Sequence, residues 1–400
     1  MERTKLEKYS KEAISELTGN ILPFWMKNVI NYGSGSFNGS VAGGGTINPS
    51  ADKGAVMAAR ILWTFSRAFI KLNDAQYLRT ADLMFKYIVS HFLDKKHGGV
   101  FWTLDGSGKP LVTTKKMYAQ GFTMYAFAEY AKASGSSRAL DEAKNLFSLV
   151  EKYGRDIKNS GYIDALSADW SLISDMRLSA KEMNTPKSMN TNLHVMEALS
   201  VLVMYFKDKQ ALEALENIVN VFAVKMLMPN KHFGMFFDRK WNGKSGIISY
   251  GHDIEGSWLI TEAAEITGSK VLIELADQTA IHMAEAVLKE GLDKDGSLFN
   301  EGDESGPHKM RKEWWMQAEA MVGFLNAYQL TKKEVFLEKS ISVWEYVKKN
   351  FRSPQGEWYF FIGIDGKPGL DHDLAGPWKC PYHNGRACLE VYERIEKLLK

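Results

Sequence analysis

The segment Gly98-Gly-Val-Phe-Trp-Thr103 decides how the chain is organised, because it cannot be helical. Two successive glycines break a helix, and the aromatic and β-branched residues after them are typical of a short strand. Asp105-Gly-Ser-Gly108 then supplies a turn, so the sequence predicts a β-hairpin here. Four later segments have the same character: Ser160-Gly-Tyr-Ile-Asp164, His232-Phe-Gly-Met-Phe-Phe237, Asp295-Gly-Ser-Leu-Phe299 and Gly356-Glu-Trp-Tyr-Phe-Phe361.

The hairpin segments repeat at a nearly constant spacing. Their central glycines are separated by intervals of 62, 73, 62 and 60 residues, and they are Gly99, Gly161, Gly234, Gly296 and Gly356. Such a period indicates a stacked or closed array of supersecondary units. The stretch Gly33 to Gly45 fits a sixth hairpin.

Helical periodicity fills the chain between the hairpins. Apolar residues recur at spacings of three and four, which predicts about twelve amphipathic or buried helices. Their expected ranges are 4–18, 51–71, 75–92, 115–133, 137–153, 190–207, 209–227, 254–267, 269–289, 311–330, 333–350 and 384–399.

Six helix pairs joined by hairpins predict an all-α fold, a single (α/α)6 barrel with short β-hairpins on the pocket side. Residues 1–400 contain no Pro/Ser linker or break in composition, so we expect one catalytic domain. The long polar loop from Ser167 to Lys187 is expected to fold over the mouth of the cavity.

Composition excludes several classes of partner. Fifty basic and 48 acidic residues give a net charge of +2, without a basic stripe or tail, which argues against nucleic acid and anionic membrane partners. The sequence contains no apolar signal region and no apolar run of about 20 residues. Two cysteines, Cys380 and Cys388, argue against a disulfide scaffold. We expect a soluble, cytoplasmic protein that is a monomer or a weak homodimer.

The stretch Ser249-Tyr-Gly-His-Asp-Ile-Glu-Gly-Ser-Trp-Leu259 places two titratable residues at the start of a buried helix. His252 and Glu255 are three residues apart, so their side chains share a helix face. The positive end of the helix dipole favours the neutral imidazole, which is the state that a general base needs. The alternative is a capping glutamate beside a core histidine with satisfied hydrogen bonds.

The barrel geometry predicts that first turns far apart in sequence meet at one pocket. In each repeat the hairpin leads into the next helix, so the N-termini of the inner helices converge. The polar and aromatic residues that these turns present are Arg60, Tyr118, Asn190, His194, His252, Glu255, Trp315, Glu319, Trp378, His383 and Arg386. Tyr118 is equally compatible with a core position, and Arg386, one turn from Glu390, suggests an ion pair within its helix.

Three histidines beside carboxylates could also bind zinc. Zinc-binding histidines usually have a tight local spacing such as H-E-x-x-H, which His194, His252 and His383 lack. Cysteines in an apolar helical run are more often small core residues than ligands. The sequence therefore predicts no metal and no cofactor.

Four separated motifs, which occur in the expected order over essentially the whole chain, resemble those of the cellobiose 2-epimerases of the N-acylglucosamine 2-epimerase superfamily. They are Lys187-Ser-Met-Asn-Thr-Asn-Leu-His-Val195, Ser249-Tyr-Gly-His-Asp-Ile-Glu-Gly-Ser-Trp258, Lys312-Glu-Trp-Trp-Met-Gln-Ala-Glu319 and Gly376-Pro-Trp-Lys-Cys-Pro-Tyr-His-Asn-Gly-Arg-Ala-Cys388. Two positions depart from the family pattern: Asn192 stands where histidine is frequent, and Gly256 where alanine is. Neither position is catalytic in the family.

The resemblance implies inversion of C2 in the reducing-end glucose of β-1,4-linked disaccharides, through ring opening and a cis-enediolate. His252 and His383 match the family's acid/base pair, and Glu255 is expected to orient His252 and stabilise its charged form. His194 would assist ring opening, with Asn190, or bind hydroxyls, and Arg60 would hold the oxyanion. Trp315 and Trp378 resemble the sugar-stacking platforms, and Tyr118 and Glu319 the hydroxyl partners.

Other functions remain open from the sequence. A glycoside hydrolase is the leading rival, because (α/α)6 barrels host many chemistries, but it requires two carboxylates at a defined separation. Glu255 and Glu319 are the candidates for that pair, and the histidines outnumber them. An aldose–ketose isomerase would use the same enediolate and reprotonate a different carbon. A non-catalytic sugar-binding or protein-binding protein rarely needs two such bases.

Overall fold

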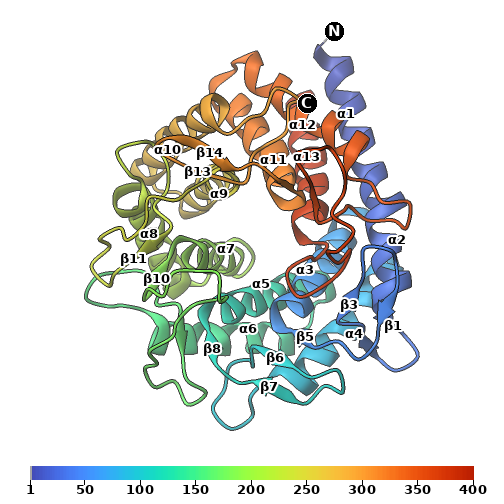
Figure 1. Ribbon diagram of the computed structural model, residues 1–400. Coiled ribbons are helices and arrows are strands. Elements are labelled where there is room, and N and C mark those ends of the chain that lie inside the picture. Colours follow the sequence, from blue (N-terminus) through green and yellow to red (C-terminus); the bar gives the residue numbers. More distant parts are fainter. Residues whose placement is uncertain (1) are drawn as a thin grey trace.

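Six helices of equal length form the inner wall of a closed ring in the computed structural model, which describes residues 2–400 (Figure 1). Each contacts the next around the ring, and α13 contacts α3 to close it. Most of their residues are buried whichever face of the helix they occupy, because one face lines the lumen and the other packs on an outer helix. They are α3 (Ala55–Leu72), α5 (Met117–Ser134), α7 (Met189–Phe206), α9 (Tyr250–Thr267), α11 (Trp314–Thr331) and α13 (Tyr382–Leu399).

Six outer helices surround this wall, each packed mainly on one inner helix. The N-terminal helix α1 packs on α13, so the two ends of the chain together complete the sixth pair. The predicted (α/α)6 barrel and its twelve helices are therefore confirmed. The outer helices are α1 (Glu2–Glu16), α4 (Ala75–Tyr87), α6 (Ser137–Leu149), α8 (Lys209–Val221), α10 (Lys270–Glu290) and α12 (Glu334–Asn350).

Several outer helices end in a wider π-helical turn. Three such turns extend α4, α6 and α8, at Ile88–Phe92, Val150–Gly154 and Phe222–Met226. The N-terminal helix runs further than predicted, through Leu17–Ile21, the short α2 (Leu22–Phe24) and Trp25–Val29. Gly19 and Pro23 both lie within this extension. The π turn before Pro23 accommodates the proline, because its wider hydrogen-bonding pattern relieves the clash with the preceding turn.

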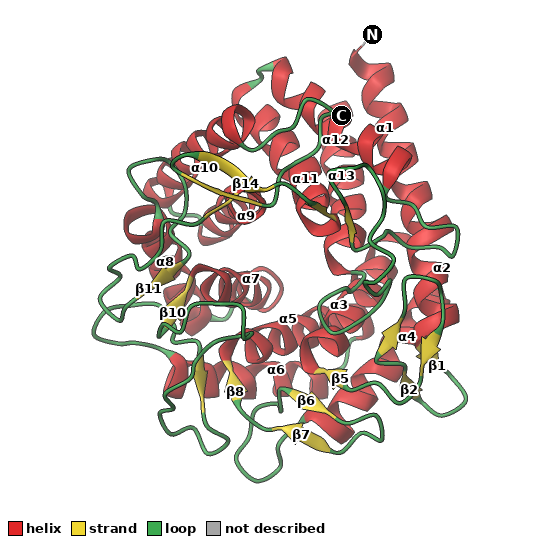
Figure 2. Cartoon of the chain, in the orientation of Figure 1, coloured by secondary structure: helices red, strands yellow, loops and turns green. Residues whose placement is uncertain are grey.

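Short strands occupy the connections in front of the ring and not its wall (Figure 2). A two-residue strand leads directly into each of five inner helices and pairs with the hairpin of the next repeat, in the pairs β5–β6, β8–β9, β10–β11, β12–β13 and β15–β16. This pairing holds the N-termini of neighbouring inner helices at the same end of the barrel. The strands are β1 (Ile30–Asn31), β2 (Ser36–Phe37), β3 (Ser40–Val41), β4 (Ile47–Asn48), β5 (Lys53–Gly54), β6 (Thr103–Leu104), β7 (Pro110–Val112), β8 (Lys115–Lys116), β9 (Ala165–Leu166), β10 (Lys187–Ser188), β11 (Phe236–Phe237), β12 (Ile248–Ser249), β13 (Glu301–Asp303), β14 (Gly306–Lys309), β15 (Lys312–Glu313) and β16 (Phe361–Ile362).

The fourth residue of four inner helices fastens a hairpin to the helix. Gln317 accepts a hydrogen bond from Leu298 N at 2.8 Å and donates to Leu298 O at 2.9 Å. Gln120 does the same for Val100, Asn192 for Tyr162, and Asp253 accepts from Phe233 N. The departure from the family pattern at Asn192 thus lies at a structural position.

Replacing Gln317 with leucine should lower the free energy of unfolding by about 2–4 kcal/mol, because it leaves a buried N–H and a buried C=O without partners. Denaturant or thermal unfolding followed by circular dichroism measures this loss. Gln210→Leu, at an exposed position of α8, is the matched control and should change stability by no more than about 0.5 kcal/mol. Equal effects of the two substitutions would show that the hydrogen bonds between Gln317 and Leu298 contribute nothing to stability.

Among the described residues, no helix is long and apolar enough to cross a membrane. The predicted loop from Ser167 to Lys187 lies at the open end of the ring, where Lys116 Nζ binds the carbonyl oxygens of Arg177 and Leu178. Its residues Ser179, Lys181 and Glu182 line the cavity mouth.

Candidate active site

The second and sixth residues of the inner helices point into the lumen at the hairpin end of the barrel. A helix presents residues four apart on one face, so these positions form two stacked layers of side chains. The second-residue layer holds Tyr118, Asn190, Trp315 and His383, and the sixth-residue layer holds Arg60, His194, Glu255 and Glu319. His252, the third residue of α9, joins them. The structure therefore brings together the residues that the sequence singled out from six different helices.

His252 and His383 both contact one indole ring. The ring centroid of Trp315 is 4.7 Å from that of His252 and 5.7 Å from that of His383. His194 acts electrostatically on both imidazoles, and its own ring is 5.0 Å from the Tyr118 ring. Both predicted acid/base residues thus border the same small volume.

His252 takes its orientation from Ser249 and not from Glu255. Its Nδ1 lies 2.8 Å from Ser249 Oγ, the residue that precedes α9. Helical side chains lean toward the N-terminus, so a ring in the first turn reaches back to the cap position. Glu255, one turn deeper, extends instead across the lumen to α13. The prediction that Glu255 orients His252 is therefore wrong.

His383 is the imidazole with carboxylates against it. Its Nδ1 lies 2.7 Å from Glu319 Oε1 and 3.7 Å from Glu255 Oε1. Because His383 Nδ1–H donates its hydrogen bond to Glu319, Nε2 is the nitrogen left to act on a ligand. Glu319 also accepts from Trp258 Nε1 at 3.0 Å, which fixes the carboxylate.

Burial keeps the histidines neutral. It lowers the pKa of His252 to about 3, and the neighbouring His194 adds to this effect. Burial also lowers the pKa of His383 well below its usual value, with Arg60 and Arg386 contributing. The pKa of His194 is lowered by burial as well, against the pull of Glu197. The site thus presents unprotonated imidazole nitrogens near neutral pH.

Arg386 is the centre of the charge network beneath the histidines. Its Nη2 donates to Glu255 Oε1 and Glu319 Oε1, each at 2.7 Å, and its Nη1 donates to Glu197. The suggested helix ion pair between Arg386 and Glu390 is wrong, because Glu390 binds Arg394 at 2.9 Å. The pKa of Glu255 is raised well above its usual value by burial and by the neighbouring Glu319. The Arg386 guanidinium opposes this rise without cancelling it.

Sequence reasoning missed Glu197 and Ser249. Glu197 is buried, with His194 Nδ1 donating to one of its oxygens and Tyr382 Oη and Arg386 to the other. The signal that could have found it is a glutamate three residues after a histidine on a buried, largely apolar helix, where an unpaired charge is costly. Ser249 could have been found as a hydroxyl three residues before His252.

Arg60 and Tyr118 form the opposite wall. Arg60 is 2% exposed, and its Nη2 donates to Tyr118 Oη at 2.8 Å. Its guanidinium also lies over the Phe122 ring, 4.4 Å from the centroid. The guanidinium also acts electrostatically on the Cys380 thiol. Tyr118 is buried and also faces the lumen. The core position and the pocket position that the sequence allowed are therefore both correct.

The mouth of the site is a cavity of about 640 Å³ that Asn190, His252 and Trp315 line. Trp315 is held there by Glu313, whose Oε2 accepts from the indole Nε1 at 2.9 Å. Trp314, its neighbour, is 3% exposed and belongs to the core, as expected. Trp378 is 36% exposed at the rim, where its ring lies 6.1 Å from that of Tyr118.

Glu255, Glu319 and His383 are the one group of three potential metal ligands among the described residues. Arg386 Nη2, bound to both carboxylates, already supplies the positive charge between them. A divalent cation would add further positive charge beside a buried guanidinium. The donor set therefore fits proton transfer and does not fit a metal. Cys380 and Cys388 are buried and free, and burial raises the pKa of the Cys380 thiol to about 11.

Residues 35–387 match the family described as N-acylglucosamine 2-epimerase (GlcNAc 2-epimerase). A cellobiose 2-epimerase from Bacteroides fragilis is 40% identical over 384 residues, which cover 95% of this chain and 98% of the relative. One from Dictyoglomus turgidum is 35% identical and covers 98% and 100%. The structure of cellobiose 2-epimerase from Bacillus thermoamylovorans B4167 superimposes with a TM-score of 0.92 at 36% identity, covering 97% of this chain and 100% of that one.

Proposed function

The chain belongs to the N-acylglucosamine 2-epimerase family and is an isomerase, and we propose that it epimerises C2 of the reducing-end glucose of β-1,4-linked disaccharides. Cellobiose would give glucosyl-mannose, and lactose would give epilactose. The observation that carries the proposal is the pair of imidazoles, His252 and His383, bordering one stacking platform, Trp315. The relatives that are named cellobiose 2-epimerases support the substrate class.

The chemistry follows from the acidity of C2. The C2 proton becomes acidic once the sugar ring opens to an aldehyde, and its removal gives a cis-enediolate. One imidazole starts neutral, takes this proton and becomes an imidazolium, while the other starts with a proton on the nitrogen that faces the sugar, delivers it to the opposite face of C2 and becomes neutral. We propose that His252 is the base in one direction and His383 the acid, with the roles exchanged in reverse, because Glu319 stabilises the protonated form of His383.

The remaining residues position the sugar and its charge. Arg60, whose guanidinium lies beside Tyr118, and the converging N-termini of the inner helices would stabilise the enediolate oxygens. His194 would move a proton during ring opening, with Asn190 beside it. Trp315 and Trp378 would stack on the sugar rings, and Tyr118 and Glu319 would bind hydroxyls.

Hydrolysis fits these residues less well. A glycosidase requires one carboxyl group that donates a proton to the leaving oxygen and a second that acts as base or nucleophile. Glu255 and Glu319 are both bound to Arg386, and Glu319 is also engaged by His383. We further propose that residues 1–400 act as one catalytic domain without a cofactor, in the cytoplasm, as a monomer or weak homodimer that binds neither nucleic acid nor membrane.

Product analysis tests the proposed reaction. Cellobiose, lactose and mannobiose are each incubated with the protein, and the products are identified by NMR. A disaccharide whose reducing end has changed between glucose and mannose supports epimerisation. Release of monosaccharide, or formation of a ketose as the main product, would overturn the proposal.

Ser249→Ala should lower kcat up to about tenfold and change KM less, because the lost hydrogen bond to His252 Nδ1 is worth about 0.5–1.5 kcal/mol. The Ser249 side chain makes no capping bond, so the helix should keep its stability. Ser257→Ala on the same helix, where the hydroxyl binds Ile254 O, is the control and should leave kcat unchanged. An unaltered kcat in Ser249→Ala would show that Ser249 does not orient His252.

A further inference from the structure

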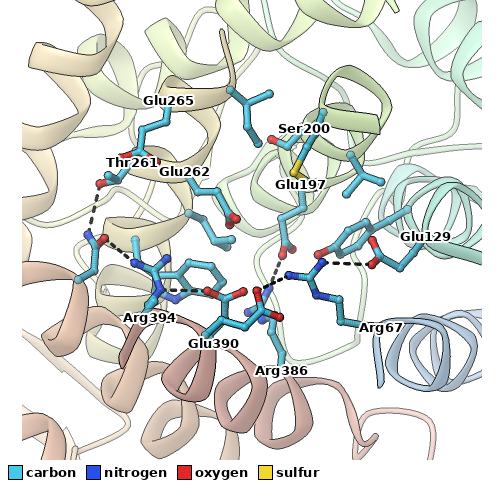
Figure 3. Close-up of a pocket in the computed structure, with 18 of the residues that line it drawn as sticks. Arg67, Glu129, Glu197, Ser200, Thr261, Glu262, Glu265, Arg386, Glu390 and Arg394 are labelled. Atoms are coloured by element: carbon cyan, nitrogen blue, oxygen red, sulfur yellow. Dashed lines mark hydrogen bonds and ion pairs between the residues drawn. The ribbon is translucent and has the colours of Figure 1, made fainter. Parts of the chain in front are cut away.

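A second cavity lies at the opposite end of the barrel, where the inner helices end (Figure 3). We call it the rear chamber and define it by the thirteenth residues of five inner helices: Arg67, Glu129, Glu262, Asn326 and Arg394. Its volume is about 510 Å³, within the range of about 300–1,000 Å³ that is typical of small-molecule sites. Nothing in the proposed reaction uses these residues.

The electrostatics of the rear chamber favour a cation. Six helix C-termini converge on this end, and each carries the negative pole of its helix dipole. The arginines are already paired: Arg67 binds Glu393 at 3.1 Å, and Arg394 binds Glu390 at 2.9 Å. Arg67 also lies 3.6 Å from Glu129.

These pairings leave over two carboxylates that line the chamber, Glu265, which is exposed, and the more buried Glu262. Glu262 is partly buried, and Figure 3 shows it directed into the cavity with no hydrogen bond or ion pair to the other residues drawn. Burial and the nearby Glu390 raise the pKa of Glu262 to about 7, while Arg394, Arg67 and Arg386 oppose the rise. A positively charged ligand would supply the partner that this carboxylate lacks.

One polar group in the chamber wall, the indole N–H of Trp63, favours a ligand that also carries a hydrogen-bond acceptor such as a hydroxyl. Trp63 lines the chamber and is 4% exposed, and its indole Nε1 has no hydrogen-bond partner among the described residues. An unpaired buried donor calls for an acceptor, which a bare ammonium ion cannot provide. The described part of the chain groups three potential metal ligands only on the catalytic side, so an organic cation fits the chamber better than a metal ion.

We propose that the rear chamber binds a small hydroxylated organic cation, an amino alcohol or an amino sugar, with its ammonium group against the carboxylate of Glu262. The wall between the two cavities is shared. Glu197, Trp258 and Arg386 line the rear chamber, and on their other side they contact His194 and Glu319. An occupant of the chamber therefore lies one side chain away from the charge network under the histidines.

The experiment compares two probes that differ in one group. Tris and pentaerythritol have the same branched skeleton, but Tris carries an ammonium group where pentaerythritol carries a hydroxymethyl group. Isothermal titration calorimetry is done in phosphate buffer at a mildly alkaline pH, at which Glu262 is ionised. We expect Tris to bind at least about tenfold more tightly than pentaerythritol, a ratio that corresponds to about 1.4 kcal/mol.

Variants locate the bound probe. Glu262→Gln should weaken Tris binding about tenfold or more, whereas Glu274→Gln, an exposed position on α10, should leave it unchanged. His252→Ala, on the catalytic side, should also retain binding, and circular dichroism checks that each variant is folded. Equal affinities for the two probes, or Tris binding that is lost in His252→Ala but kept in Glu262→Gln, would overturn the proposal. The test measures binding alone, so it stands apart from the proposed reaction.

Discussion

His383→Ala should lower kcat for C2 epimerisation by about 10²–10⁴-fold, the range for loss of a general acid or base. The imidazole is the group that Glu319 orients toward the lumen at 2.7 Å, and alanine leaves no proton carrier on that face of the sugar. His252→Ala should have an effect of the same order, because each imidazole serves one face of C2. Steady-state kinetics with cellobiose measures both losses.

The control is His282→Ala, on the outer helix α10 and away from the lumen. It should retain full activity. Thermal unfolding of all three variants separates lost chemistry from lost folding. A His383→Ala or His252→Ala variant that keeps kcat within about tenfold of the unmodified chain would remove that residue from proton transfer.

Arg386→Met should lower the free energy of unfolding by about 3–5 kcal/mol near neutral pH, because it strands buried carboxylates without their cation. Arg386 is 2% exposed and donates to Glu197, Glu255 and Glu319. Chemical denaturation measures the loss. The matched control is Arg177→Met, whose guanidinium pairs with Asp175 in an exposed loop, and it should change stability by no more than about 0.5–1 kcal/mol.

The deficit of Arg386→Met should depend on pH. Without the guanidinium, Glu197 loses the cation that does most to lower its pKa, and the pKa of Glu255, which burial already raises, rises further. A folded state with raised carboxyl pKa values loses stability as the pH increases and regains it on acidification, so the deficit should be smaller at acid pH. Adding Glu197→Gln to Arg386→Met removes one stranded charge and should restore part of the stability. A deficit that is independent of pH and of Glu197 would contradict the electrostatic account.

The repeating pattern of the sequence was sufficient to predict the architecture. Glycine hairpins at a constant period and helices between them predict the ring, because each repeat must bury its apolar face against its neighbours. The left-handed backbone of Gly99, Gly161, Gly296 and Gly356 explains why glycine marks these turns. Gly234 is different: its φ is not left-handed, and a Cβ there would lie 2.7 Å from the Phe237 ring.

The site could be predicted as a set of residues but not as a set of contacts. Spacing along one helix identifies lumen-facing positions such as His194 and Glu255. It does not show which side chains meet across the lumen, and Arg386 and Glu197 are 189 residues apart. The assumed local pairs, His252 with Glu255 and Arg386 with Glu390, were wrong because a buried charge takes the best-placed partner from any helix.

The central claim is that two imidazoles act on opposite faces of C2, and the most direct test is isotope incorporation early in the reaction. Cellobiose is incubated with the protein in heavy water, and C2 is followed by NMR in both the product and the recovered substrate. The two-base account predicts deuterium at C2 of the first glucosyl-mannose formed, while the unreacted cellobiose keeps its protium. Product that retains its C2 protium, or deuterium that appears at C2 of the unreacted cellobiose as early as in the product, would contradict it.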